Sequence, residues 1–294
     1  MTKLTSLDVS YNSFQYDLPT NYIALQRLKI LRVANNALTG SSANQILFGI
    51  DALEELDLSN NPGMNGEIFR VKNVVAIGHS RNLTVLDISH CQFTGQLNYA
   101  ILEEFPIRVF RADGNDFFGT LPVGSEWRRR RRRQLQEVND PFDSGHSFQP
   151  DRDHAVDWNM GTGLQSLSVF SASNNRFSGT FPWNNILGHD AALNLEYLDV
   201  SGNSITGDLP PNAIGEFTNL QYLDMSSNKL SSSIPSSIGQ MTNLKVLNLQ
   251  GNNLQGSLPA HLGNCTKLER LGLNSNDLTG TIPNELSNIP SLGK

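Results

Sequence analysis

Apolar residues recur along this chain at fixed distances from an asparagine, and the pattern returns about every 24 residues. In each copy, apolar side chains stand eight, five and three positions before an anchor residue and usually again two positions after it. The copy anchored at Asn228 shows this with Leu220, Leu223, Met225 and Leu230. The ten anchors are Asn12, Asn36, Asn61, Cys91, Asn115, Asn175, Asn203, Asn228, Asn252 and Asn276. Ten agreeing copies are typical of a repeat protein whose stacked coils share one core.

The anchor and the residues before it have different expected roles. Side chains alternate along a strand, so the residues five and three positions before the anchor should point inward, and those six, four and two positions before it outward. An inward Asn offers donors and an acceptor to backbone groups where the chain leaves the sheet. Stacked anchors should therefore form a structural ladder, in which Cys91 replaces Asn once.

A second half-motif, N-x-L-x-G-x-[ILF]-P, follows the anchor. It is complete at residues 115–122, 175–182, 203–210, 252–259 and 276–283. Glycine permits tight coiling, and proline fixes the backbone near polyproline or first-turn geometry. The motif favours short 3-10 or polyproline segments on the convex side over full helices. Tyr16 and Ser232 stand where glycine is expected.

Together, the two half-motifs resemble the plant-type leucine-rich repeats of receptor-like kinases, receptor-like proteins and polygalacturonase-inhibiting proteins. The resemblance covers nearly everything outside residues 123–163. It implies an α/β solenoid, a leucine-rich repeat horseshoe or superhelix of about ten repeats with a parallel concave β-sheet. Residues 1–122 would hold repeats one to five, and residues 164–294 repeats six to ten.

Residues 123–163 form the expected insert, because the anchors Asn115 and Asn175 are 60 residues apart. The run Arg128 to Arg133 and a following acidic stretch, with Pro, Gly and Ser, favour a charged flexible loop. The arginines could be a solvated stretch, a processing site, or a targeting or polyanion-binding patch. Related plant receptors carry an island domain at a similar position, although no motif of theirs is present here.

The charge and the cysteine count restrict the chemistry less than the repeats do. The formal net charge is −6, although six of the 22 basic residues are consecutive. An acidic array argues against nucleic acid as the main partner and suits a basic ligand better. The chain has no Ser, His and Asp arrangement in a nucleophile-elbow context, no phosphate-binding loop and no kinase signature, so no enzyme, cofactor or metal is expected. Only two cysteines occur, and Cys91 and Cys265 are too many repeats apart to form a disulfide.

The ends of the chain suggest a piece of a larger protein or an incomplete gene model. Met1 lies three residues before the first repeat leucine, and no cysteine-bearing cap, signal peptide or bilayer-spanning apolar run is found. Two sequons, at Asn82 and Asn264, are candidate glycosylation sites outside the concave sheet. The expected location is extracellular or at the cell surface as part of a longer protein, and cytoplasmic if the chain is complete.

Outward positions of the predicted sheet include two neighbouring tyrosines. Tyr197 and Tyr222 stand six positions before their anchors. Beside them on the same face are Asp199, Asp224, Ser201 and Ser226, and Arg111 and Asp113 lie earlier on it. Aromatic area flanked by carboxylates suits a basic or hydroxyl-rich ligand. Alternatively, the Asp and Ser are frame residues of the repeated L-D-[VIM]-S phrase, because Asp also recurs at this register without tyrosine neighbours.

These features favour a non-catalytic recognition module. The first hypothesis is a cell-surface receptor ectodomain in signalling or defence that binds a protein, a peptide or a small extracellular ligand. The second is a secreted inhibitor of a cell-wall-degrading enzyme, and the third is an intracellular scaffold. The ligand itself does not follow from the fold.

Overall fold

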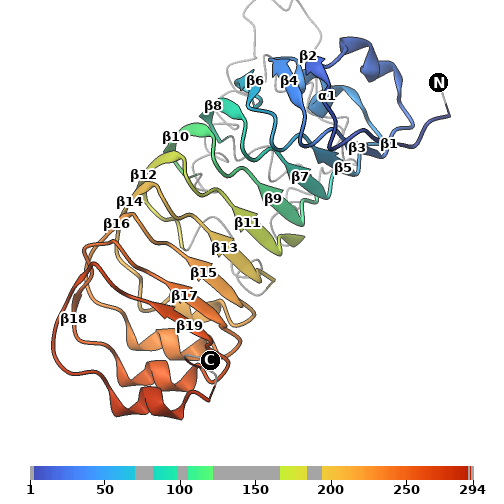
Figure 1. Ribbon diagram of the computed structural model, residues 1–294. Helices are drawn as coiled ribbons and strands as arrows, with labels where there is room; N and C mark the ends of the chain where they lie inside the picture. Colours follow the sequence, from blue (N-terminus) through green and yellow to red (C-terminus); the bar gives the residue numbers. More distant parts are fainter. Residues whose placement is uncertain are drawn as a thin grey trace, which may run out of the picture.

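A computed structural model describes residues 3–69, 82–97, 105–121, 166–183, 194–290 and 292, and it shows a curved solenoid with parallel sheets (Figure 1). Each anchor is preceded by one strand of a ten-stranded parallel sheet, here called the main sheet. Its strands are β1 (Ser6–Asp8), β3 (Ile30–Arg32), β5 (Glu55–Asp57), β7 (Val85–Asp87), β9 (Val109–Arg111), β11 (Val169–Ser171), β13 (Tyr197–Asp199), β15 (Tyr222–Asp224), β17 (Val246–Asn248) and β19 (Arg270–Gly272). The leucine-rich repeat fold predicted from the sequence is confirmed.

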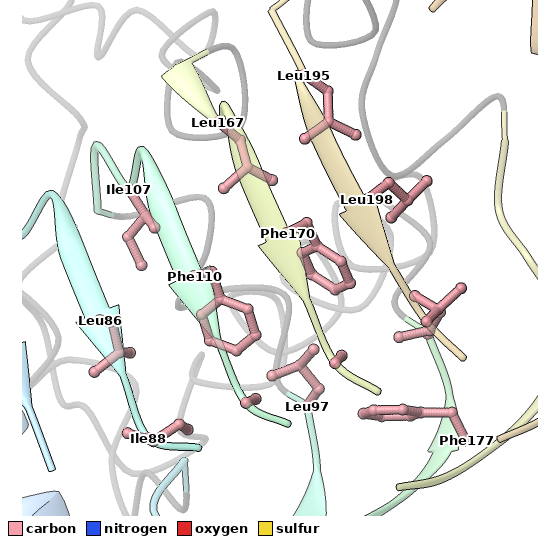
Figure 2. Close-up of a cluster of buried hydrophobic side chains, with 14 of the residues drawn as sticks. Leu86, Ile88, Leu97, Ile107, Phe110, Leu167, Phe170, Phe177, Leu195 and Leu198 are labelled. Atoms are coloured by element: carbon pink, nitrogen blue, oxygen red, sulfur yellow. The ribbon is translucent and has the colours of Figure 1, made fainter. Parts of the chain in front are cut away.

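The core follows the predicted alternation along each strand. The middle residue of nearly every main-sheet strand is inaccessible or half-buried, whereas both its neighbours remain at least partly exposed in most strands. Figure 2 shows side chains such as Phe110 and Phe170 in register on adjacent strands, and their ring centroids lie 5.5 Å apart. One continuous apolar stack therefore links repeat to repeat, as expected for a solenoid.

A second parallel sheet, which the sequence did not predict, follows the anchors. It has eight strands, β2 (Gln15–Tyr16), β4 (Ala37–Gly40), β6 (Gly63–Gly66), β8 (Gln92–Gln96), β10 (Asp116–Thr120), β12 (Arg176–Thr180), β14 (Ser204–Gly207) and β16 (Lys229–Leu230). A separate pair continues it with β18 (Gln255–Gly256) and β20 (Asp277–Leu278). The half-motif N-x-L-x-G carries a short alternation of its own, but its pairing partners lie one repeat away and no single copy reveals them.

The convex side carries short 3-10 helices, as predicted. These are η1 (Thr20–Ala24), η4 (Ile214–Glu216), η5 (Ser236–Gln240), η6 (Ala260–Asn264) and η7 (Asn284–Asn288). In four of them a proline stands directly before the first helical residue, where its fixed φ suits the start of a helix. One α-helix, α1 (Ala43–Gly49), replaces the 3-10 turn and buries Ile46 and Leu47.

Each anchor asparagine connects its own repeat to the one before it. The Asn228 Nδ2 group donates to the carbonyl oxygens of Val200, Met225 and Ser226 at 2.9, 3.2 and 3.1 Å. Its Oδ1 atom accepts the backbone N–H of Ile205 at 2.9 Å. The same four bonds recur at Asn36, Asn61, Asn115, Asn175, Asn203, Asn252 and Asn276. Asn12, in the first repeat, makes only the two donor bonds to its own repeat.

Cys91 is the one anchor that is not Asn. Its thiol lies 3.4 Å from the Leu58 carbonyl oxygen but offers no strong acceptor in place of Oδ1. The preceding repeat carries one additional residue after Asn61, and there the N–H of Met64 donates to the Asn61 carbonyl oxygen at 3.0 Å. The donor that an anchor asparagine would have accepted is thus satisfied by a backbone turn.

The repeat stack continues across the long step between the fifth and sixth anchors. Strand β9 pairs with β11, and β10 pairs with β12, in parallel register. The predicted insert at 123–163, with its arginine run, lies outside the described residues.

Ser232 occupies a position where the repeat motif has glycine, and its backbone conformation there is strained. Its φ is +71°, in the left-handed region that disfavours a side chain. We expect Ser232→Gly to raise the free energy of unfolding by about 1 kcal/mol, measured by urea denaturation. Ser233→Gly, one residue further on and without a positive φ, should be destabilising instead, and a stabilising effect there would contradict this explanation.

Candidate functional site

Two tyrosines stack on the outward face of the main sheet. Tyr197 and Tyr222 are direct partners in the register of β13 and β15, with ring centroids 4.3 Å apart and planes 8° from parallel. Both side chains are half-buried. Asp199 and Asp224 are paired in the same register two residues further along. We call Tyr197, Tyr222, Asp199 and Asp224 the tyrosine patch.

The two serines predicted beside the patch are held by its carboxylates. The Asp199 Oδ1 atom accepts the Ser201 backbone N–H at 2.9 Å and the Ser201 hydroxyl at 2.7 Å. Asp224 Oδ1 accepts the Ser226 N–H at 2.9 Å. The same Asp-to-Ser bonds recur at Asp8, Asp57 and Asp87. One oxygen of each aspartate therefore belongs to the repeat frame, which is the role that the alternative interpretation assigned to it.

The second oxygens of the two aspartates differ. Asp224 Oδ2 accepts the Asn248 Nδ2 group at 2.8 Å and lies 3.4 Å from the Tyr222 hydroxyl. Asp199 Oδ2 has no hydrogen-bond partner within the part of the chain that the structure describes. Asn248 was not among the predicted site residues, although it stands at the same register as Asp224 on the neighbouring strand.

Arg111 and Asp113 lie on the same face but do not join the patch. The Arg111 guanidinium is 3.8 Å from Asp87 Oδ2 on β7. Asp113 Oδ1 accepts the Ser171 hydroxyl at 2.6 Å and the Ser173 N–H at 2.8 Å, a frame role across two repeats. Strand β11 separates Arg111 from the patch, which places the two about 10 Å apart.

The patch concentrates negative charge in a partly desolvated place. Burial is the main cause that raises the pKa of Asp199, and the carboxylates of Asp224 and Asp113 raise it further. Burial also raises the pKa of Tyr197, to which Asp199 adds. The charged form of Asp199 is therefore disfavoured by its surroundings, and a positive charge placed beside it would restore the usual balance.

The two sequons lie away from the main sheet. Asn264 is exposed at the end of η6, and Asn82 is exposed just before β7. The Thr84 hydroxyl of the first sequon donates to the Glu54 carbonyl oxygen at 3.1 Å. Both candidate acceptors thus remain on the surface without occupying the face that carries the tyrosine patch.

Both cysteine thiols should react slowly in the folded chain. Burial raises the pKa of Cys91 to about 12 and that of Cys265 to about 11, so the reactive thiolate is scarce near neutral pH. We expect Ellman's reagent at pH 8 to modify neither thiol at an appreciable rate in the native protein and both promptly in guanidinium. Fast modification of the native protein would show that one of the two is accessible.

Within the described ranges, no group of three or more His, Cys, Asp or Glu side chains is placed to hold a metal ion. No helix in these ranges has the length and apolar character needed to span a bilayer.

Family models agree with the repeat geometry. A model described as Leucine Rich repeats (2 copies) matches residues 193–238, one described as Leucine Rich Repeat matches 243–265 and 267–289, and a third, Leucine Rich repeat, matches 79–96. A comparison with curated proteins finds no significant match. The family models identify leucine-rich repeats in this chain, and the similar solved structures are consistent with repeats of the plant type.

Solved structures similar to this chain include plant receptors. The plant peptide hormone receptor RGFR1 in complex with RGF2 is 29% identical, with a TM-score of 0.76, and the PEPR1–AtPEP1 structure is 31% identical, with a TM-score of 0.77. Each match covers 99% of this chain but only 39% and 34% of those chains. A plant ice-binding protein at 19% identity and a TM-score of 0.65, matched over 96% of this chain and 77% of its own, shares the fold alone.

Proposed function

We propose that this chain is the ligand-recognition part of a cell-surface receptor ectodomain and that its main sheet binds an extended peptide. The observation that carries the proposal is the tyrosine patch. A stacked aromatic pair with a free carboxylate oxygen stands on an open sheet face, where the repeat frame alone would need neither tyrosine. Tyrosine supplies large contact area at low conformational cost, and it is frequent among residues that dominate binding energy.

The similar receptor structures support this reading. RGFR1 is described as a plant peptide hormone receptor and was solved with RGF2, and both that structure and PEPR1–AtPEP1 match nearly the whole of this chain. A location outside the cell accords with this role. An inhibitor of a cell-wall-degrading enzyme would bind a folded protein instead, and no described residue favours that alternative.

The test is a selection of short peptides from a displayed random library on the immobilised 294-residue chain, followed by affinity measurement with a labelled synthetic peptide. We expect Tyr197→Ala combined with Tyr222→Ala to weaken binding by about 30-fold. Val85→Ala combined with Val109→Ala changes a neighbouring pair at the same register of β7 and β9 and is the matched control. It should change the affinity by no more than about threefold.

Circular dichroism and thermal unfolding establish that both double variants fold. Equal affinities of the parent and the tyrosine variant for every selected peptide would overturn the proposal that this face is the binding site. A selection that yields only binders of the convex side would do the same.

A further inference from the structure

The two halves of the main sheet differ in how their charges are balanced. In the first half, Arg32 lies between Asp8, at 3.6 Å, and Glu55, whose Oε1 is 2.6 Å from the arginine Nε. Arg111 lies beside Asp87 in the same way on β9 and β7. On β1, β5 and β7, the negative charges of Asp8, Glu55 and Asp87 are thus each balanced by a nearby arginine of the protein.

In four strands of the second half, β11, β13, β15 and β17, such an arginine is missing. The next outward arginine, Arg270 on β19, pairs in register with Val246 and not with Asp199 or Asp224. The outward residues of β11, β13, β15 and β17 are Val169, Ser171, Tyr197, Asp199, Tyr222, Asp224, Val246 and Asn248. None of them is basic. Among the residues that the structure describes, neither Asp199 nor Asp224 forms an ion pair, and the two carboxylates are register neighbours on adjacent strands. This part of the sheet therefore carries negative charge that the protein does not neutralise.

The hydrogen bonds within the patch limit which groups are available to a ligand. The Ser201 hydroxyl already donates to Asp199, and the Asn248 amide already donates to Asp224. What the patch still offers is an acceptor, Asp199 Oδ2, together with aromatic surface and the Tyr197 hydroxyl. A sugar or other hydroxyl-rich ligand would leave the charge of Asp199 unbalanced, and an anion would be repelled. A donor-rich cation matches both the acceptor and the aromatic surface.

We propose that the tyrosine patch binds the guanidinium group of an arginine in the peptide ligand, which would balance Asp199 as Arg32 balances Asp8 and Glu55 in the first half of the sheet. The inference rests on the proposed peptide-binding function and specifies its ligand. Tyr222 covers one face of the Tyr197 ring, and the other face lies toward β11, beside Val169. A guanidinium stacked there meets the ring face by a cation–π contact and reaches Asp199 Oδ2 with its N–H groups.

The experiment uses an arginine-containing peptide from the library selection and a copy in which citrulline, a neutral isostere, replaces each arginine in turn. Fluorescence anisotropy gives the affinity for the parent chain and for Asp199→Asn, which keeps the size of the side chain and an acceptor for Ser201. At one peptide position we expect citrulline to weaken binding at least about tenfold. Asp199→Asn should weaken binding of the arginine peptide by a similar factor.

The losses of affinity caused by citrulline and by Asp199→Asn should not add. The citrulline peptide should bind the parent and Asp199→Asn within about twofold of each other, because the charge pair is already broken. Asp57→Asn is the matched control: Asp57 has the same register and the same two bonds to its serine, but it lies in the first half of the sheet. It should leave both affinities nearly unchanged.

Two results would overturn the arginine site and leave the peptide-binding function intact. The selected peptides could lack arginine at a defined position, or the citrulline peptides could bind as tightly as the arginine peptide. Peptides whose binding ignores the tyrosine double variant as well would overturn both. A lysine that replaces the arginine with undiminished affinity would overturn the guanidinium preference.

Discussion

Gly239→Ala is expected to lower the free energy of unfolding by about 3 kcal/mol. Gly239 lies in η5, which packs against η6 on the convex side. A Cβ atom added there would stand 2.3 Å from the carbonyl oxygen of His261 and 2.9 Å from its carbonyl carbon. Backbone atoms cannot rotate away, so the helices must separate and loosen the core beneath them. Urea denaturation followed by circular dichroism measures the loss.

Two neighbouring substitutions separate this steric explanation from a general effect of alanine. In Gly215→Ala the nearest atom is the end of the Gln240 side chain, which can move aside, and the backbone oxygen of Ser237 is 3.0 Å away, farther than the 2.3 Å at Gly239. The loss of stability should therefore be smaller, about 1 kcal/mol. Ser236→Ala changes an exposed residue of η5, the helix that contains Gly239, and should be nearly neutral. If Gly215→Ala and Gly239→Ala were equally destabilising, backbone contact would not be the cause.

Asn228→Ala should also cost about 3 kcal/mol, because several buried backbone groups lose their partner at once. The amide donates to three carbonyl oxygens and accepts the N–H of Ile205, which is itself buried. Alanine replaces none of these bonds, and the packed interior leaves no room for water to do so. Binding to the main sheet should barely change, since the anchor side chain points away from that face.

Asn12→Ala is the matched control for this prediction. Asn12 holds the same position in the first repeat, but it is exposed and makes only two of the four bonds. Water can take over those bonds, so we expect a loss below about 1 kcal/mol. Equal losses at the two positions, measured by thermal unfolding, would show that burial and the link between repeats do not set the cost.

Much of the fold was predictable because every repeat has the same spacing of apolar residues around its anchor. The spacing of leucines around anchors such as Asn228 predicted the main sheet, and the proline after the half-motif predicted the 3-10 turns. The second sheet was not predicted, since its hydrogen bonds join residues of different repeats. A signal that was overlooked is the residue directly before each anchor, which has a positive φ in all ten repeats. It is Asn or Gly in six of them, the residues that adopt this conformation most easily.

The candidate site was predictable only in part. Strand register placed Tyr197 beside Tyr222 from the sequence alone, because a fixed repeat puts equivalent residues next to each other. Which oxygen of Asp199 is engaged depends on its rotamer, and no spacing rule gives that. Arg111 lies on the predicted face, and its partner Asp87 is its direct register neighbour on the adjacent strand, so the repeat spacing already places the two side by side. Side-chain rotamers therefore decide which groups belong to the repeat frame and which remain free for a ligand.

The backbone turn at Met64 couples the extra residue after Asn61 to the identity of the next anchor, Cys91. Cys91→Asn alone would supply an Oδ1 atom whose natural donor is already committed to the Asn61 carbonyl oxygen. Deletion of Pro62 alone would restore the usual length and turn that donor toward a thiol that accepts poorly. We expect Cys91→Asn and the deletion of Pro62 each to be unfavourable alone. Together they would restore the regular hydrogen bonds of an anchor asparagine. The two departures are therefore epistatic, and the regular and irregular forms of this repeat are separated by a less stable intermediate sequence whichever change comes first.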